Sequence, residues 1–334
     1  MCGIAGFVND MPIDVKCPVL QRMTDMIAHR GPDSEGHYID EHAALGHRRL
    51  SIIDLGGGQQ PIYNEDGSKV ITFNGEIYNY QTLREELIAA GHTFTTKSDT
   101  EVLLHGYEQW GVDLLQRVRG MFTFVIWDKN KQELFGARDH FGIKPFYYAK
   151  MNGTFMYASE IKSLLRHPDF VKELNAEALK PYMTFQYPAI GETFFKGVYK
   201  LPEGHYFTYR DGKMDIHRYY DEDFREGKQK LGELVNSIDQ TVCDSVKAHQ
   251  IADVEVGSFL SSGVDSSYVA AVARPQHTYS IGFGKGTYNE SQQAGELAEL
   301  LKLNNTAESL TDEEAFAAFP RIQCSDPRRA VQQR

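Results

Sequence analysis

The chain has 334 residues, of which 41% are hydrophobic, so we expect two domains that each bury a core of their own. Its net charge of −11 argues against a nucleic-acid binder, because no basic stripe is available to neutralise phosphates. The four cysteines form no CxxC pair, which argues against a disulfide framework or a zinc ribbon. No apolar run reaches the length of a membrane span, and the N-terminal one is too short for a signal peptide. We therefore expect a soluble, cytoplasmic protein without nucleic-acid or membrane partners.

The first two hundred residues alternate short β-like runs with a few helical ones. Strands are expected over residues 4–8, 44–53, 70–73, 122–127, 133–137, 146–149 and 154–158. Helical periodicity marks residues 20–28, 80–90 and 99–110, and Gly91 and Gly111 follow the last two as C-caps. This mixture predicts stacked sheets with helices outside them.

The pattern changes after a polar and charged stretch around residues 208–230, which predicts a domain boundary. Beyond it we expect a helix over 231–248, a strand over 254–260, a Ser/Gly loop and a helix over 266–273. A strand over 278–283 and a helix over 290–301 follow. Alternating β and α elements of this kind predict a parallel α/β sheet.

Cys2 sits directly after the initiator methionine. Removal of Met1 would leave a thiol and a free α-amine on the same residue. An α-amine, with a reference pKa of about 8, can accept the thiol proton, so no His or Asp is needed to activate the attack. Taken alone, however, the position is better explained as an incidental small residue entering the first strand.

Three further positions each allow a chemical and a structural interpretation. Asn74 and Gly75 follow a strand and can donate two hydrogen bonds to an oxyanion, but Asn-Gly is also a strong turn signal, and spacing alone favours the turn. Arg49 can hold an α-carboxylate through two parallel hydrogen bonds, or it is an ordinary surface arginine. Asp99 can hold a substrate ammonium, or it shares with Ser98 the role of a helix N-cap.

A resemblance in several ordered motifs decides between these alternatives. The motifs are Cys2-Gly3-Ile4-Ala5-Gly6, His29-Arg30-Gly31-Pro32-Asp33, His47-Arg48-Arg49-Leu50-Ser51-Ile52, Asn74-Gly75-Glu76-Ile77-Tyr78-Asn79, Ser98-Asp99-Thr100-Glu101, Arg119-Gly120-Met121-Phe122 and Ala137-Arg138-Asp139. Together they resemble the class II glutamine amidotransferases, which are N-terminal-nucleophile hydrolases with an α+β four-layer αββα sandwich. Within that class the chain is most similar to the glutamine-hydrolysing asparagine synthetases, and the resemblance extends to about residue 319.

The resemblance implies a role for each matching residue. Cys2 would be the nucleophile, and Asn74 with Gly75 would form the oxyanion hole. Arg49 would hold the glutamine α-carboxylate, and Glu76 and Asp99 would hold its α-amino group. The implied glutamine-binding set is Arg49, Leu50, Ser51, Ile52, Ile53, Asn74, Gly75, Glu76 and Asp99.

A second candidate site is the loop Leu260-Ser261-Ser262-Gly263-Val264-Asp265-Ser266. Loops between a strand and a helix present backbone N–H groups to anions, although this one is equally well explained as a Ser-rich connection capped by Asp265 or Ser266. It contains neither GxxxxGK[ST] nor GxGxxG. It resembles the pyrophosphate loop of enzymes that split ATP into AMP and pyrophosphate. The resemblance implies ATP binding by these seven residues, adenine between Leu260 and Ile281, and Mg²⁺ on Asp265.

Taken together, the resemblances of the two halves imply one reaction. Ammonia from glutamine would pass to an aspartyl-AMP made from ATP and aspartate, and asparagine, glutamate, AMP and pyrophosphate would leave. We expect an amidotransferase domain over residues 1–210 and an incomplete asparagine synthetase domain over 228–334. No organic cofactor is expected, and a homodimer is common in the family. The histidines form no HxH or HExxH pattern, so we expect no structural zinc.

The end of the sequence departs from the family pattern. An Asp-Glu-Pro stretch and a Ser-Gly-Glu-Gly-Ala-Asp-Glu motif are missing, and the residues from Gln323 to Arg334 resemble a frameshifted or prematurely ended tail. We therefore expect glutamine hydrolysis with little or no asparagine formation. The alternatives are a glutaminase alone, an inactive remnant, and another class II amidotransferase that transfers ammonia to a different acceptor.

Overall fold

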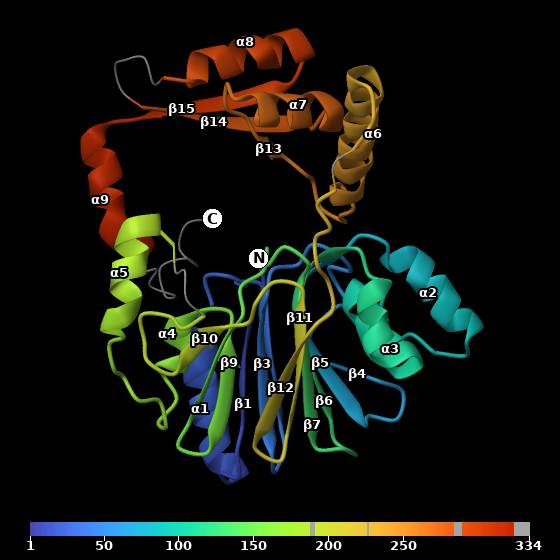
Figure 1. Cartoon of the computed structure of the whole chain (residues 1–334), viewed down its shortest axis with the longest axis vertical. Helices are drawn as coiled ribbons and strands as arrows, with labels where there is room; N and C mark the ends of the chain where they lie inside the picture. Colours follow the sequence, from blue (N-terminus) through green and yellow to red (C-terminus); the bar gives the residue numbers. More distant parts are fainter. Residues whose placement is uncertain (188–190, 226, 284–288, 324–334) are drawn as a thin grey trace. The chain divides into compact units, whose positions relative to one another are not determined.

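The computed structural model describes residues 1–187, 191–225, 227–283 and 289–323, and for 319–323 the backbone only. The described residues form two units, and the boundary between them along the chain lies between Asp223 and Phe224 (Figure 1). The first unit thus runs beyond the expected end at residue 210. The reason is a hairpin within the stretch that was expected to form the boundary, and this hairpin belongs to a sheet of the first unit.

The first unit is built on two six-stranded antiparallel sheets. One has the order β10-β8-β9-β1-β3-β2. Its strands are β1 (Gly3–Val8), β2 (Ser34–Ile39), β3 (Ala43–Arg49), β8 (Tyr147–Met151), β9 (Thr154–Ala158) and β10 (Val198–Lys200). The other has the order β12-β11-β7-β6-β5-β4. Its strands are β4 (Ile62–Tyr63), β5 (Lys69–Ile77), β6 (Gly120–Asp128), β7 (Glu133–Arg138), β11 (His205–Arg210) and β12 (Lys213–Arg218).

Helices cover the outer face of each sheet, which gives four layers. Helices α1 (Ile13–Asp25) and α4 (Ile161–Leu164) pack on the β1 sheet, and α2 (Tyr80–Ala89) and α3 (Asp99–Trp110) pack on the β5 sheet (Figure 1). The core between the sheets is rich in aromatic side chains from both, including Trp127, Phe155 and Phe207. Burial of apolar surface on three interfaces stabilises the arrangement. The expected αββα sandwich is confirmed.

Two expected strands of the first unit end four residues away from their expected ends. The strand expected over 44–53 ends at Arg49, and the strand expected over 70–73 continues to Ile77. Asn74 therefore pairs with Thr123, and Gly75 with Phe122, inside a sheet. The turn that spacing alone favoured at Asn74-Gly75 is wrong, because cross-strand pairing overrides local turn propensity.

The helices around the second sheet agree closely with the sequence pattern. Helix α3 has the expected bounds, and Ser98 is its N-cap, since its side chain accepts a hydrogen bond from the Thr100 N–H. Gly111 caps its C-terminus with a φ of 59°.

Helix α1, which packs on the first sheet, was expected over 20–28 and lies over 13–25 instead. The elements that were not expected include α5 (Ala176–Phe185) and the 3₁₀ helix η1 (Gly111–Gln116).

The second unit contains a small parallel sheet in the order β13-β14-β15, and the parallel arrangement is the one that the alternating pattern predicted. The strand expected over 254–260 is limited to Ser258–Phe259, and β15 was not expected. The elements of this unit are α6 (Leu231–His249), β13 (Ser258–Phe259), α7 (Val264–Ala273), β14 (His277–Phe283), α8 (Ser291–Leu301), β15 (Asn304–Leu310) and α9 (Asp312–Gln323). Its core is formed by Leu260, Ala270, Ala294 and Ala298. The expected tail after Gln323 lies outside the described residues. Of the helices in the described ranges, none combines the length and the apolar character needed to cross a bilayer.

Candidate active site

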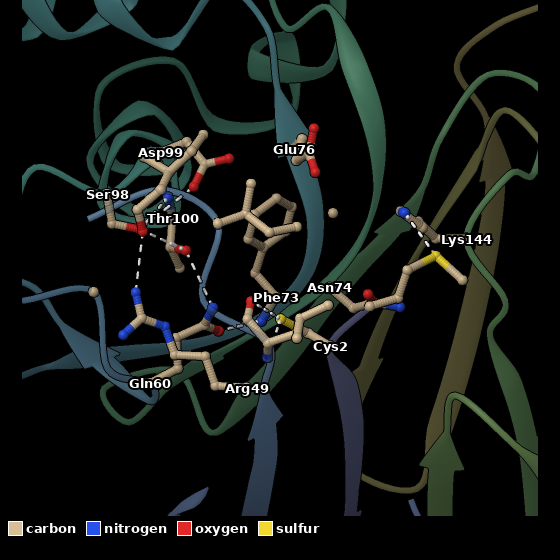
Figure 2. Close-up of a pocket in the computed structure, with 16 residues that line it drawn as sticks. Cys2, Arg49, Gln60, Phe73, Asn74, Glu76, Ser98, Asp99, Thr100 and Lys144 are labelled. Carbon is tan, nitrogen blue, oxygen red and sulfur yellow. Dashed lines mark hydrogen bonds between the residues drawn. The ribbon is translucent and has the colours of Figure 1, made fainter. Parts of the chain in front are cut away.

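A pocket in the first unit collects most of the residues that the motifs singled out (Figure 2). It lies where the start of β1 and the ends of β3 and β5 meet the N-terminus of α3, and the empty space there is about 480 Å³, part of which is open solvent. Its lining consists of Met1, Cys2, Arg49, Leu50, Ile52, Ile53, Gly58, Gln60, Phe73, Asn74, Gly75, Glu76, Ser98, Asp99, Thr100 and Lys144. Ser51 does not line it; the Ser51 N–H donates to Asp33 Oδ2 at 2.9 Å.

Strand pairing places Cys2 at this pocket. Gly3 pairs with Arg48 in the β1–β3 ladder, so Cys2 lies beside the residues that follow Arg48. The Cys2 Sγ accepts a hydrogen bond from the Leu50 N–H at 3.3 Å, and the Cys2 carbonyl accepts one from Arg30 Nε at 2.9 Å. Burial raises the pKa of the Cys2 thiol, against the lowering effects of the Leu50 backbone and the Arg49 charge. The thiol therefore needs a base to take its proton.

Asn74 offers a donor whose hydrogen-bonding capacity is unused within the protein. Its side chain is 1% exposed, and neither Nδ2 nor Oδ1 has a hydrogen-bond partner in the structure. A buried amide without a partner is unfavourable by about 1–3 kcal/mol, so such groups mark a place where a partner is expected. Figure 2 shows Asn74 beside Cys2 at the pocket.

Gly75 is required by the close approach of β5 and β6. A Cβ atom on this residue would lie 2.2 Å from the Met121 carbonyl oxygen and 2.7 Å from the Phe122 Cα. Any side chain at this position would push the two strands apart and displace Asn74 with them. The glycine therefore keeps the end of β5 in its place at the pocket.

Arg49 provides a positive charge on one side of the pocket. Its guanidinium is 5% exposed and donates to the carbonyl oxygens of Ile53 at 3.0 Å and Asp54 at 2.7 Å. The interpretation of Arg49 as a surface residue is therefore wrong. No carboxylate among the described residues forms an ion pair with it, so the charge remains available to an anion in the pocket.

Asp99 and Glu76 provide negative charge elsewhere in the same lining. The Asp99 carboxylate is 4% exposed and accepts a hydrogen bond from the Ile77 N–H at 3.0 Å. Burial, with a contribution from the charge of Glu76, raises the pKa of Asp99 to about 7. A cation in the pocket would stabilise the ionised form. A guanidinium and two carboxylates in one lining suit an α-amino acid, whose charges have the opposite signs.

Several lining residues were missed by the sequence reasoning. Gln60 connects the two sides of the pocket, because its Nε2 donates to Thr100 Oγ1 at 3.2 Å and its Oε1 accepts from the Phe73 N–H at 2.6 Å. Lys144 is buried and its Nζ lies 3.1 Å from the Met1 Sδ (Figure 2). Thr100 lies in a motif that the resemblance used. Gln60 and Lys144 stand in loops outside those motifs, so no pattern indicated them.

The second candidate site lies in the other unit, at the end of β13 and the start of α7. Ser266 Oγ holds the loop together: it accepts from the Ser261 N–H at 3.2 Å and lies 2.8 Å from Ser261 Oγ. Gly263, rather than Asp265 or Ser266, is the N-cap of α7. Asp265 and Val264 are exposed, and Ser262 is partly exposed. A loop at the carboxyl end of a parallel strand, with a helix N-terminus beside it, is a common anion site.

The two apolar residues assigned to this second site differ in exposure. The Leu260 side chain is 3% exposed and packs in the core of the unit, while its N–H donates to the Tyr279 carbonyl at 2.8 Å. Ile281 on β14 is 52% exposed. The structure thus leaves Ile281 open to a ligand and commits the Leu260 side chain to the core.

Known proteins resemble both parts of the chain. Residues 1–220 match a family model described as a glutamine amidotransferase domain, and residues 237–325 match one described as asparagine synthase. The chain is 43% identical to glutamine-hydrolyzing asparagine synthetase 1 of Bacillus subtilis (strain 168), over 96% of this chain and 52% of the relative. It is 36% identical to asparagine synthetase 3 of the same organism, over 85% of this chain and 48% of the relative. The chain spans about half the length of these curated relatives.

The fold also has a counterpart among solved structures. A protein described as the allosteric regulatory enzyme of purine biosynthesis aligns with a TM-score of 0.51 and 14% identity, over 93% of this chain and 80% of that one. At this identity the similarity is one of fold. The amidotransferase model, in contrast, matches more than half of the present sequence. The chain therefore belongs to the glutamine amidotransferase family.

Proposed function

We propose that the first unit hydrolyses the side-chain amide of glutamine, with Cys2 as the nucleophile. The observation that carries this proposal is the buried Asn74 amide, which has no partner in the protein and lines the same pocket as the Cys2 thiol. A hydrolase needs a donor of this kind, already in place, for the negative charge that develops on the carbonyl oxygen. Family membership supports the same chemistry.

The proposed reaction begins with removal of Met1, which gives Cys2 a free α-amine. The amine takes the thiol proton, and the sulfur attacks the amide carbon of glutamine. The oxyanion accepts hydrogen bonds from Asn74 Nδ2 and the Gly75 N–H. As the tetrahedral intermediate collapses, the amine returns its proton to the leaving nitrogen and ammonia departs. Water, deprotonated by the same amine, then hydrolyses the thioester to glutamate and regenerates the thiol.

The proposed pose of glutamine follows from the charges of the lining. Arg49 binds the α-carboxylate, while Asp99 and Glu76 bind the α-ammonium. The chain segment from Leu50 to Ile53 forms one wall, with Leu50, Ile52 and Ile53 in the lining. Ser51 is a positioning residue in this scheme, because its backbone holds that segment to Asp33.

We further propose that the whole reaction is glutamine-dependent asparagine synthesis. ATP binds at Leu260–Ser266 and beside Ile281, Asp265 holds a Mg²⁺ ion, and aspartate is the acceptor that becomes aspartyl-AMP. The match of residues 237–325 to the asparagine synthase model supports this, as do the names of the relatives. The exposed Asp265 in the first turn of α7, next to a serine-rich loop, fits a hydrated Mg²⁺ on a phosphate.

Three further points belong to the same proposal. The enzyme works without an organic cofactor, as a homodimer, and in the cytoplasm. Cys2, Cys17 and Cys243 are free thiols in the structure, which fits a reducing compartment. Sedimentation of the purified chain tests the dimer.

The proposed function is tested with glutamine labelled with ¹⁵N in its amide. Incubation of the purified chain with this substrate should release labelled ammonia together with glutamate. With ATP, Mg²⁺ and aspartate added, label in asparagine would identify aspartate as the acceptor. Accumulation of glutamate with all the label in free ammonia would restrict the function to glutamine hydrolysis. Failure to form glutamate would contradict the proposal.

A further inference from the structure

Four potential metal ligands gather beside α3, on residues outside the lining of the glutamine pocket. They are Glu65 in the β4–β5 connection, His92 after α2, and His105 and Glu108 on α3. One ligand atom from each lies within 4.8 Å of the ligand atoms of all the others. The two histidines are too far apart in sequence to form a short metal-binding pattern, which explains why no zinc was expected.

Three of the nitrogen–oxygen separations in the cluster are close to those of a tetrahedral site. His105 Nδ1 lies 3.3 Å from a Glu65 oxygen and 3.2 Å from a Glu108 oxygen, and His92 Nδ1 lies 3.2 Å from the other Glu65 oxygen. Zinc binds nitrogen and carboxylate oxygen at about 2.0–2.2 Å, so the ligands of a tetrahedral ion lie about 3.3–3.5 Å apart. An ion fits among these atoms if the side chains move closer together, since the four ligand atoms are separated by up to 4.8 Å.

The opposite edge of each imidazole faces an oxygen atom. His92 Nε2 lies 3.3 Å from Gln109 Oε1, within hydrogen-bond distance. His105 Nε2 has no hydrogen-bond partner in the structure, and a Glu101 carboxylate oxygen lies 3.5 Å from it. Metal-bound histidines usually donate their other N–H to such an acceptor, which fixes the ring and its tautomer. Both rings are thus placed to present Nδ1 to a common ion.

The carboxylate ligands are also held from outside the cluster. Glu108 Oε1 accepts from Asn64 Nδ2 at 2.7 Å, and Glu65 Oε1 accepts from the Thr93 N–H at 3.1 Å. The exposed fraction of the side chain rises from 1% at His105 to 37% at Glu65, so the cluster reaches from the interior to the surface. An ion can therefore enter from solvent.

The charges of the cluster favour a divalent cation. Glu65, Glu101 and Glu108 carry three negative charges, and Lys69, 3.4 Å from Glu108, supplies one positive charge. With both imidazoles neutral, two negative charges remain, which one divalent ion neutralises.

We propose that Glu65, His92, His105 and Glu108 bind one divalent transition-metal ion of the zinc class. Two nitrogen and two carboxylate ligands suit zinc better than magnesium, which requires an octahedral set of oxygens. The ion fastens the β4–β5 connection and the loop after α2 to α3, whose first residue, Asp99, lines the pocket. This site goes beyond the proposed glutamine hydrolysis and does not depend on it.

The test is calorimetric titration of the full chain with Zn²⁺ after treatment with a chelator. The titrations are done on the Cys2→Ala chain, so that the pocket thiol does not contribute a second site. We expect one bound ion per chain. His92→Ala in this background should weaken binding by about tenfold or more, because even an outer contact of a metal ligand contributes about 10- to 100-fold to affinity. Glu65→Gln should act in the same direction.

His42→Ala is the matched control, because His42 also faces a carboxylate, that of Asp10, but lies outside the cluster. It should bind Zn²⁺ as tightly as the parent. Substitution of Co²⁺ gives a second readout on the parent chain, where the intense visible absorption of a tetrahedral site is expected. Absence of a one-to-one Zn²⁺ site in the parent, or equal affinity in the His92→Ala and parent chains, would overturn the proposal. So would binding of Mg²⁺ in preference to Zn²⁺.

Discussion

The thiol of Cys2 lies against the backbone of Leu50, whose N–H donates to the sulfur across 3.3 Å. Leu50 follows the last residue of β3, so its N–H stands at the point where the strand ends. A main-chain donor therefore holds the sulfur at the pocket, and the side chain at position 50 is not needed for this contact. The end of β3 at Arg49 positions the nucleophile as well as the arginine.

Asn74→Ala should lower the rate of glutamine hydrolysis while leaving the fold intact. Loss of one oxyanion donor reduces kcat by about 10²–10³-fold. Because the Asn74 amide has no partner in the protein, its removal breaks no hydrogen bond and relieves a buried unpaired group, so the free energy of unfolding should not fall. Steady-state kinetics and urea unfolding measure the two effects.

Asn175→Ala is the control for this variant. Asn175 is also buried, but its Nδ2 donates to Glu192 and to the Thr193 carbonyl. We expect a loss of stability of about 1–3 kcal/mol, with kcat of the folded protein unchanged. Equal kcat in the Asn74→Ala and native proteins would exclude Asn74 from the oxyanion hole.

Arg49→Lys should raise the KM for glutamine more than it lowers kcat. A lysine keeps the charge but cannot make two parallel hydrogen bonds to a carboxylate, and hydrogen bonds to a charged group contribute about 1.5–3 kcal/mol, which corresponds to about 10- to 100-fold in KM. An amide substrate that lacks the α-carboxylate should be hydrolysed equally by both proteins. A KM increase of the same size for that substrate would show that Arg49 acts only by holding Ile53 and Asp54.

Asp99 should make stability depend on pH. Its pKa rises from 3.8 to about 7 on folding, so between these values the native state holds a proton that the unfolded state has lost. The stabilisation is complete below about pH 4 and is lost as pH rises through about 7, by about 4 kcal/mol at most. Asp99→Asn should remove this component, so that its unfolding free energy falls less than that of the native protein between pH 4 and pH 8. Parallel slopes for the two proteins would contradict the assignment.

The same carboxylate should make glutamine binding tighter as pH rises through about 7, because the ionised form attracts the substrate ammonium. Binding is measured on the Cys2→Ala chain, which retains the substrate. Glutamine affinity should be higher at pH 8 than at pH 6, and Cys2→Ala combined with Asp99→Asn should show weaker binding with no such rise. A rise that persists in the double variant would assign it to another group.

Ser266→Ala should weaken ATP binding by the second unit. Ser266 Oγ contacts both the N–H and the hydroxyl of Ser261, so its loss loosens the loop that is proposed to hold the phosphates. These two hydrogen-bonding contacts, of about 1 kcal/mol each, allow a decrease in affinity of about tenfold or more. Ser267→Ala on the same helix is the control and should bind ATP normally. Unchanged affinity in Ser266→Ala would remove the loop from the site.

Local patterns predicted elements with clear periodicity and end signals well, and elements that depend on strand pairing poorly. Helix α3 combines an apolar periodicity with a Ser98 cap and a Gly111 end, and its bounds agree with the prediction. Strand β15, Asn304–Leu310, has few apolar residues and is ordered by pairing with β14 along its whole length, which no local signal shows. The same holds for the turn expected at Asn74-Gly75, where pairing with β6 overrides the dipeptide preference.

The residues of the candidate site were indicated by motifs, whereas their surroundings depend on the tertiary fold. From its sequence context, Arg49 could also have been an ordinary surface arginine, whereas in the structure it is 5% exposed. Gln60 joins Phe73 to Thr100, and these contacts arise only when β5 and α3 lie side by side. The cluster around His105 is likewise assembled from three separate segments. Contacts between segments that are distant in sequence could not be predicted from the local sequence patterns.

The release of ammonia from glutamine by the native chain, by Cys2→Ala and by Cys17→Ala tests the central claim most directly. Cys17 is an exposed free cysteine on α1 and serves as the matched control. We predict that the native and Cys17→Ala chains form glutamate and ammonia in equal amounts and at equal rates, and that Cys2→Ala forms neither. Ammonia release by Cys2→Ala at the native rate would contradict the account.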